Sequence, residues 1–401
     1  MSNQERKIRN LLEKGVSGII DKENLEKRLK NGEKLRIKFG IDPTGAQVHI
    51  GHGVPIMKLR AFQDMGHQIV LIIGDATGQI GDASDKDAER PMLKRQETLA
   101  NAQNYIDQIG KILDVSKLEI HYNSEWMDKI SFCDVGELAK NFSVAEMLDR
   151  DNFSKRYKGG IRISLQEFLY PLMQGYDSVA IKADVELGGN DQYFNLLAGR
   201  KLQEAFSQNK QDIMTFNLIE GTDGRKMSKS YKNFIGLAES ANDMFVKLME
   251  INDELIIKYF EHCTLLDLED IEPYKDRMKS GENPRNIKLD LAFTITEFYH
   301  GKESAEKAKE YFLNSISAGS RPKDEDIETA ILNESEYELF VLIKELKIFG
   351  TSGEIKDAIA GGGIKINEEV AKDPKQIIKL DKNTKTLVQA GRKKFKNVVC
   401  N

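Results

Sequence analysis

The sequence has few cysteines and no long hydrophobic run. Its three cysteines, Cys133, Cys263 and Cys400, lie far apart and form no pair motif, which argues against a disulfide framework or a zinc cluster. No apolar stretch approaches the length of a membrane-spanning helix. The first residues, Met1 to Arg6, lack the hydrophobic core of a secretion signal. These absences favour a cytoplasmic protein in a reducing compartment, with no membrane partner and no tightly bound metal.

The length and the composition indicate a globular protein with more than one domain. A chain of 401 residues is too long for one compact core, so two or three domains are expected. Hydrophobic residues make up 40% of the sequence and charged residues 31%, which is ordinary for a globular protein. The net charge of -5 does not exclude nucleic acid as a partner, because binding depends on a local basic patch.

Alternating strand and helix patterns in the first half predict an α/β fold. Residues 35–40 have the pattern of a strand, 53–65 of a helix, and 69–73 of an apolar strand covered on both faces, which makes a βαβ unit. Further helices are predicted at about 94–113 and 191–206, and strands at 118–122, 180–187 and 213–217. The alternation favours a Rossmann-like, doubly wound parallel sheet with ligands at the carboxyl ends of its strands.

The remaining segments are expected to form helices and a small third domain. Residues 3–30 are predicted as one polar amphipathic helix, and residues from about 128 to 180 as a helical insertion. After residue 230 the pattern is mainly helical to about residue 348, and a Lys-rich segment follows. The predicted domains are a catalytic domain over 1–225, an α-helical domain over 226–335 that begins at a basic loop, and an α+β module over 336–401.

Two histidines follow the first predicted strand in a glycine-rich turn. His49 and His52 end the stretch that begins at Asp42, just where a helix is predicted to start. A helix N-terminus offers free N–H groups and a positive dipole end to phosphate. Gly51 lets a ligand approach the backbone, and both imidazoles can donate hydrogen bonds to phosphate oxygens. The pattern favours a phosphate site over two incidental histidines.

Two other stretches carry polar side chains that suit a ligand. The loop at 224–230 reads GRKMSKS, and its cations and hydroxyls suit a polyphosphate, although alone it is better explained as a solvated basic loop. Tyr170, Gln174 and Asp177 lie at i, i+4 and i+7, on one face of a predicted helix. That face suits a polar ligand, and a solvated helix face would show the same spacing.

Taken together, these motifs resemble those of a known family. The run His-Ile-Gly-His at 49–52 and the run Lys-Met-Ser-Lys-Ser at 226–230 match the two signatures of class I aminoacyl-tRNA synthetases letter for letter and in order. The segment 170–177 narrows the resemblance to bacterial-type tyrosyl-tRNA synthetases, over residues 5–399. The resemblance implies an enzyme that activates L-tyrosine with ATP and Mg²⁺, transfers it to the 3′ end of tRNA(Tyr), and forms a homodimer through the helical segment near 130–180.

The resemblance also implies roles for single residues. Four residues would stabilise charge on the phosphates: His49, His52, Lys226 and Lys229. The tyrosine site would contain Thr77, Asp82, Tyr170, Gln174, Asp177 and Gln192, with Tyr170 and Gln174 at the α-amino group, Asp177 at the phenol and Gln192 at the carboxylate. The ATP and adenylate site would contain Asp42, Gly51, Gly189, Asp191, Met227 and Ser228.

The sequence departs from the family pattern at two places. Lys38 stands where many bacterial tyrosyl enzymes have a tyrosine that also contacts the phenol, so this second contact stays open. The C-terminal segment resembles an S4-type RNA-binding domain, but Glu354 and Asp357 replace residues that are commonly basic. The cations expected to meet RNA are Lys379, Lys382, Lys385, Arg392, Lys393, Lys394 and Lys396.

Two other functions stay open. A tryptophanyl-tRNA synthetase has the same fold and both signatures, but the tyrosyl pattern at Tyr170, Gln174 and Asp177 argues against it. A synthetase-derived RNA-binding protein without activity would need no phosphate site, and both signature loops are intact.

Overall fold

The chain folds into two compact units, residues 1–301 and residues 302–401. A computed structural model describes residues 2–43, 48–82, 95–227, 231–317, 327–349, 351–382, 384–391 and 394–400. Each unit has its own sheet, so we describe each by itself.

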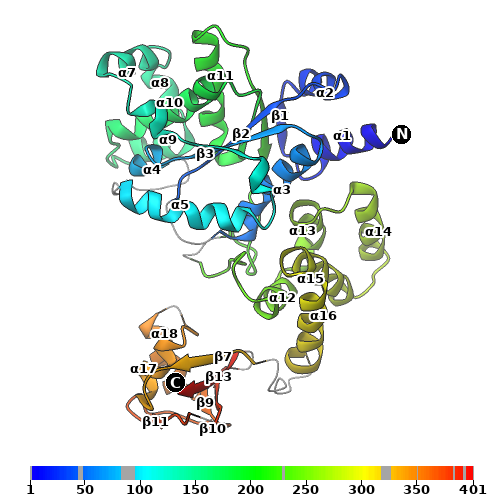
Figure 1. Cartoon of the computed structure of the whole chain (residues 1–401), viewed down its shortest axis with the longest axis vertical. Helices are drawn as coiled ribbons and strands as arrows, with labels where there is room; N and C mark the ends of the chain where they lie inside the picture. Colours follow the sequence, from blue (N-terminus) through cyan, green and yellow to red (C-terminus); the bar gives the residue numbers. More distant parts are fainter. Residues whose placement is uncertain are drawn as a thin grey trace. The chain divides into compact units, whose positions relative to one another are not determined.

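A six-stranded, mostly parallel sheet forms the core of the first unit (Figure 1). Its strands are β1 (Gly18–Ile20), β2 (Arg36–Ile41), β3 (Gln68–Ile73), β4 (Glu119–Tyr122), β5 (Val185–Gly189) and β6 (Asp212–Phe216), in the order β1-β6-β5-β2-β3-β4. The last five are parallel, whereas β1 is antiparallel to β6, so the sheet is mixed. The predicted α/β class is confirmed. The strand predicted at 180–187 begins only at Val185, because the preceding helix continues to Ile181.

The N-terminal segment differs from its prediction. Instead of one helix over 3–30, the chain forms α1 (Asn3–Glu13), the short strand β1 and α2 (Lys22–Lys30). Gly15 and Asp21 both adopt a positive φ of 64°, which breaks the helical path on either side of β1. A three-residue strand has little local signal, and β1 exists because it pairs with the distant strand β6, Ile19 facing Met214.

Helices connect the strands and extend the first unit. They are α3 (Ile50–Asp64), α4 (Thr77–Ile80), α5 (Arg95–Ile109), α6 (Ser124–Met127), α7 (Phe132–Ala139), α8 (Val144–Leu148), α9 (Asp151–Lys158), α10 (Leu165–Ile181), α11 (Tyr193–Ala205), α12 (Ala241–Glu250), α13 (Ile256–Cys263), α14 (Leu268–Lys279) and α15 (Pro284–His300). The predicted helical segment at 128–180 is therefore confirmed. Helix α10 packs closely on α11 through Gly175, where a Cβ atom would lie 3.0 Å from the backbone of Ala198.

The strand order reverses beside β2, and this reversal locates the ligand site. The chain runs from β2 outward to β3 and β4, and then returns to β5 on the other side of β2. In sheets of this kind a crevice opens at the carboxyl ends of the strands where the order reverses. Asp42, Gly74 and Asn190 are the first residues after β2, β3 and β5, so they line the expected crevice.

The second unit is a small α+β module with an apolar core. A five-stranded sheet has the order β10-β9-β12-β13-β7, and β11 pairs with β8. The elements are α16 (Lys302–Tyr311), a π-helical turn (Phe312–Ser317), β7 (Thr329–Leu332), β8 (Glu336–Glu338), α17 (Leu339–Glu345), α18 (Ser352–Ala360), β9 (Ile364–Ile366), β10 (Glu369–Val370), β11 (Ile377–Lys379), β12 (Thr386–Ala390) and β13 (Lys394–Cys400). The expectation of helix up to residue 348 is wrong at β7 and β8, since both strands depend on distant partners, β13 and β11.

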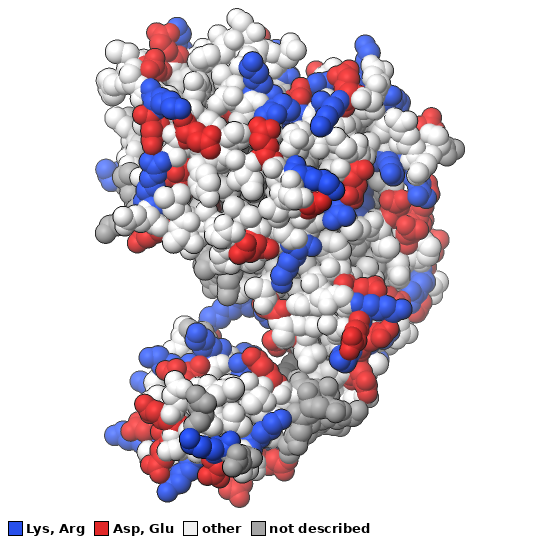
Figure 2. Space-filling model, viewed as in Figure 1, with Lys and Arg blue, Asp and Glu red and all other residues white. Residues whose placement is uncertain are grey.

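On the face shown in Figure 2, basic and acidic side chains are interspersed, and the described residues form no extended area of one sign. None of the helices in the described ranges is both long and apolar enough to cross a bilayer.

Candidate active site

Residues after β2 and β3 form a hydrogen-bonded cluster with helix α10. Asp42 accepts hydrogen bonds from the hydroxyl of Thr77 (2.7 Å) and from the phenol of Tyr170 (2.9 Å). Burial, reinforced by the Asp42 carboxylate, raises the pKa of Tyr170 well above its ordinary value, so this phenol remains a donor. Gly74 makes the cluster possible, because a Cβ atom there would lie 1.9 Å from Asp42 Oδ1.

Asp177 follows Gln174 by about one turn of α10 and lies on the same face of the helix. Its side chain is buried, with 3% of the residue's surface exposed. Trp126 Nε1 donates to Asp177 Oδ1 (2.8 Å), and Asn123 Nδ2 donates to Asp177 Oδ2 (3.4 Å) and to Thr77 Oγ1 (3.0 Å). Burial raises the pKa of Asp177 to about 7, although these donors and the nearby Lys38 favour its ionised form. The site thus offers a carboxylate acceptor in a poorly solvated place.

Asn123 and Trp126 were not identified from the sequence. Both follow β4, a strand that the sequence predicts. Their position after the carboxyl end of a strand was therefore the one feature of the sequence that indicated a place in the site. Trp126 is also the single tryptophan of the chain. Its position beside Asp177 makes it a natural fluorescent reporter for the pocket.

A second polar cluster lies where β5 ends. Gln192, in the short 3₁₀ turn Asn190–Gln192, donates to Asp82 Oδ2 (2.5 Å), and Asn195 donates to Gln192 Oε1 (3.0 Å). Gly189 leaves room for Asp191, whose Oδ1 would lie 2.3 Å from a Cβ atom at position 189. The structure therefore brings Asp82, Gly189, Asp191 and Gln192 together at this strand end.

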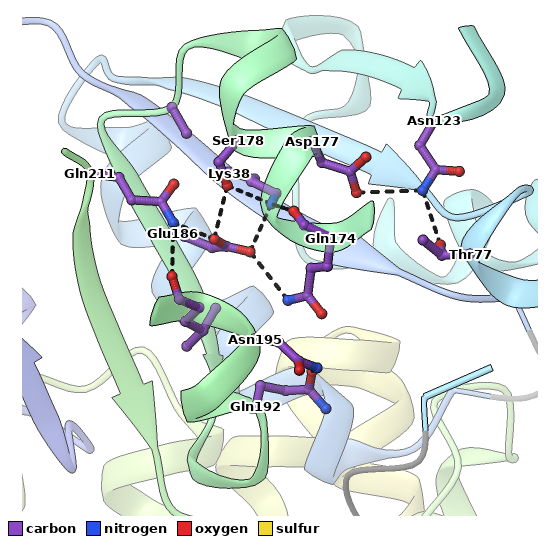
Figure 3. A network of polar contacts seen from close by, with 12 residues as sticks. Lys38, Thr77, Asn123, Gln174, Asp177, Ser178, Glu186, Gln192, Asn195 and Gln211 are labelled. Carbon is purple, nitrogen blue, oxygen red and sulfur yellow. Dashed lines mark hydrogen bonds and ion pairs between the residues drawn. The ribbon is translucent and has the colours of Figure 1, made fainter. Parts of the chain in front are cut away.

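The Lys38 side chain ends in a buried network with Ser178, Glu186 and the backbone of Gln174 (Figure 3). Its ammonium group lies 2.9 Å from Glu186 Oε1, and both side chains are almost completely buried, at 0% and 1% exposure. Gln174 Nε2 donates to the same Glu186 oxygen (3.3 Å). Position 38 therefore holds one half of an internal ion pair.

The two signature histidines lie at the N-terminus of α3. The His49 and His52 rings stack with their centroids 3.7 Å apart, and the backbone N–H of His49 donates to His52 Nδ1 (3.4 Å). An accepting Nδ1 leaves the proton of a neutral His52 on Nε2, where it can be donated. His52 is exposed. Gly51 allows the two rings to stack, because a Cβ atom there would lie 3.0 Å from His49 Nδ1.

The segment that follows the basic loop pairs with the start of α3. Ile50 N–H donates to the carbonyl of Ile235 (2.8 Å), and Leu237 N–H donates to the carbonyl of Val48 (3.0 Å). Backbone pairing thus joins the start of α3 to residues 235–237, which follow the loop in the sequence.

The first residues of the basic loop are also held in place. Lys226 forms a β-bridge with Glu220, and its carbonyl accepts from Asn233 Nδ2 (3.1 Å). The Met227 side chain is buried, whereas Lys226 is exposed. The remaining predicted loop residues, Ser228 and Lys229, lie outside the described residues.

The fold and the site define a class I tRNA synthetase. The profile of the family described as tRNA synthetases class I (W and Y) matches residues 30–315, which is more than half of the chain. The chain belongs to this family.

Its relatives narrow the family to the tyrosine enzymes. The chain is 45% identical over 387 residues to the tyrosine–tRNA ligase of Thermotoga maritima, covering 96% of this chain and 95% of the relative. It is 44% identical to the tyrosine–tRNA ligase of Francisella tularensis, with 97% of each chain covered. A C-terminally truncated mitochondrial tyrosyl-tRNA synthetase of Aspergillus nidulans shares the fold, with a TM-score of 0.65 at 22% identity over 77% of this chain and 93% of that one. Within the class, the chain is thus a member of the bacterial tyrosine–tRNA ligase family.

Proposed function

We propose that this protein activates L-tyrosine with ATP and transfers it to the 3′ end of tRNA(Tyr). The observation that carries the proposal is the buried Asp177 carboxylate, which accepts hydrogen bonds from Trp126 and Asn123 and would accept one more from the phenol of the substrate. The tyrosine carboxylate would attack the α-phosphorus of ATP and expel pyrophosphate. A ribose hydroxyl of the tRNA would then attack the acyl group and release AMP. Neither step requires a protein nucleophile.

The residues around the crevice divide among the parts of the substrates. Asp177 would accept the phenol hydroxyl, and the α-amino group would meet Tyr170 and Gln174, with Thr77 and Asp82 close by. Gln192 would contact the carboxylate, while Asp42, Gly51, Gly189, Asp191, Met227 and Ser228 would line the ATP and adenylate site. His49, His52, Lys226 and Lys229 would stabilise negative charge on the phosphates.

The proposal is tested by asking which amino acid drives the exchange of pyrophosphate into ATP. We expect exchange with tyrosine and only weak exchange with phenylalanine or tryptophan. Strong exchange with tryptophan would indicate the other branch of the family. Absence of exchange with every amino acid would indicate a protein without activation activity.

Tyrosine binding is expected to weaken below neutral pH. With the pKa of Asp177 raised to about 7, most Asp177 carboxyls are ionised at pH 8 and most are protonated at pH 6. A protonated carboxyl loses an acceptor site for the phenol, so the dissociation constant of tyrosine should rise about tenfold from pH 8 to pH 6. Trp126 fluorescence measures this titration directly. An affinity that stays constant over this range would contradict the assignment of Asp177 to the phenol.

A homodimer through the helical segment near 130–180 is part of the proposal. Large apolar side chains are exposed there, including Phe132 (92%), Leu165 (80%) and Val144 (67%). Apolar side chains that gather on one segment commonly mark an interface. We expect Leu165→Asp to shift the protein from dimer to monomer in light scattering, whereas Leu265→Asp, at an exposed site outside the segment, should leave the dimer intact. A monomeric wild-type protein would rule the interface out.

The C-terminal module is proposed to contact the tRNA as an S4-like domain. Of the predicted cations, Lys382 and Lys385 are exposed. Lys379 and Lys396 pair with glutamates of the module at 3.3 and 3.2 Å, Lys394 donates to a backbone carbonyl, and Arg392 and Lys393 lie outside the described residues. Glu354, which departs from the S4 pattern, completes a capping box with Thr351 at the start of α18. The acid therefore has a structural reason to be there.

The domain division, the metal ion and the location of the protein are also part of the proposal. We retain the three-domain division at residues 225 and 335, in which 226–335 would face the anticodon side. Mg²⁺ is expected to enter with ATP as part of that substrate, and no group of three His, Cys, Asp or Glu side chains suited to a metal occurs in the described part of the chain. A cytoplasmic location rests on the scattered cysteines.

A further inference from the structure

The Lys38 ammonium group is held by three acceptors. It donates to the Gln174 backbone carbonyl (2.7 Å) and to Ser178 Oγ (2.7 Å), and it pairs with Glu186 Oε1 (2.9 Å). An ammonium group has three N–H donors, so each has a partner. The side chain has no exposed surface, and its position in the middle of β2 is therefore fixed.

Glu186 faces donors on both of its carboxylate oxygens. Lys38 and the Gln174 side chain donate to Oε1, and Ser178 Oγ (3.1 Å) and Gln211 Nε2 donate to Oε2. A carboxylate with four donors around it is an acceptor only. Glu186 thus accepts from whichever side-chain group of Gln174 faces it, and that group must be the amide nitrogen.

This requirement sets the orientation of the Gln174 amide. The nitrogen and oxygen of a glutamine amide are nearly equal in size, so packing alone distinguishes them poorly, whereas an acceptor-only neighbour does so strongly. With Nε2 on Glu186, Oε1 lies on the opposite side of the amide, toward Gln192 and Asn195 (Figure 3). Oε1 is buried and has no hydrogen-bond partner among the residues that the structure describes. Gln174 Oε1 can therefore accept a hydrogen bond from a bound ligand.

We propose that Glu186, held by Lys38, is a positioning residue that orients the Gln174 amide so that its carbonyl oxygen accepts a hydrogen bond from the ammonium group of the amino acid substrate. The inference rests on the proposed function, in which Gln174 meets the tyrosine α-amino group. It adds a role for the ion pair, which touches no substrate and acts through Gln174. An amide turned the other way would direct two N–H donors at a cation.

A purely structural role of the ion pair would give different results. Lys38 and Glu186 join β2, β5 and α10, so they also stabilise the fold, and removal of one partner would leave a buried charge unpaired. The test therefore removes both charges together, with Lys38→Met/Glu186→Met. Two ligands separate the roles: tyrosine, and 3-(4-hydroxyphenyl)propionate, which keeps the phenol and the carboxylate but lacks the amino group.

The decisive measurement is a mutant cycle with Gln174→Met, read by Trp126 fluorescence in the full chain. In the wild-type background the double variant should weaken tyrosine binding about tenfold, the size expected for one hydrogen bond to a charged group. Binding of 3-(4-hydroxyphenyl)propionate should change less than about twofold, because this ligand has no amino group and therefore no hydrogen bond to Gln174 to lose. In the Gln174→Met background the double variant should cause no further loss of tyrosine affinity.

Several outcomes would overturn the proposal. Equal losses for the two ligands would mean that the pocket is generally damaged, and an undiminished loss in the Gln174→Met background would mean that Glu186 does not act through Gln174. If Gln174→Met itself leaves tyrosine affinity unchanged, the proposed contact of Gln174 is wrong, and the positioning role of Glu186 is wrong as well.

Glu186→Asp keeps the charge beside Lys38 but shortens the side chain that reaches Gln174. It provides a second variant if the double variant does not fold, and it should show the same selective loss for tyrosine.

Discussion

Replacement of Asp177 by asparagine is expected to lower the preference for tyrosine over phenylalanine by about 10²-fold or more. Trp126 and Asn123 already donate to the Asp177 oxygens, so the carboxylate is surrounded by donors and suits the additional phenol donor. An asparagine would offer one acceptor and place an N–H₂ group against these donors. We expect kcat/KM for tyrosine to fall about 10²-fold or more, with little change for phenylalanine.

Pyrophosphate exchange with each amino acid measures this change. The discrimination of about 10⁵ against phenylalanine reported for a tyrosyl-tRNA synthetase serves as the reference value. Asp212→Asn is the matched control. Asp212 is also a buried aspartate with a raised pKa, and it lies at the start of β6, where it accepts a hydrogen bond from Asn24 and is not proposed to contact the substrate. Full discrimination in Asp177→Asn, or an equal loss in Asp212→Asn, would show that the phenol is recognised elsewhere.

Substitution of the signature lysines is expected to slow activation far more than it weakens tyrosine binding. Lys226 and Lys229 belong to the loop that precedes Gly236, and Gly236 forms a β-bridge with His49 at the start of α3, where the ATP phosphates are proposed to bind. Cations placed where charge develops act on the transition state, so Lys226→Ala and Lys229→Ala should each lower the rate of adenylate formation by about 10²- to 10³-fold. The dissociation constant of tyrosine should change less than about twofold.

Single-turnover kinetics separates these two quantities. Lys201→Ala is a suitable control, because Lys201 is a surface lysine paired with Glu146 on the helical side of the unit. A loss that appears equally in the rate and in tyrosine affinity would contradict transition-state stabilisation by the loop. It would instead indicate a general disturbance of the site.

Elements with a strong local pattern could be predicted from the sequence. The buried run of β3 and the βαβ unit around it were predicted within a few residues. The signature histidines and lysines were also found as motifs, since their chemistry is visible in the residue types. Strands that depend on a distant partner escaped prediction, as β1, β7 and β8 show, because a short exposed strand has little pattern of its own.

The inner part of the site was only partly predictable. Tyr170, Gln174 and Asp177 could be grouped by their helical spacing, but the residues that fix them come from other elements. Asn123 and Trp126 follow β4, and Glu186 lies within β5, where a buried glutamate in an apolar strand has meaning only once Lys38 faces it. Such pairings depend on strand order, which a single sequence does not specify.

The short strand β1 also affects how the protein behaves in solution. Strand β6 is buried along its whole length and would otherwise form the edge of the sheet, where its unpaired backbone groups could recruit a strand from another molecule. By pairing with Ile213 to Thr215, β1 occupies that edge, while the opposite edge strand, β4, carries Glu119 and His121. We therefore expect β1 to hinder strand pairing between molecules, and removal of residues 1–20 should expose the backbone groups of β6 as a template for such pairing.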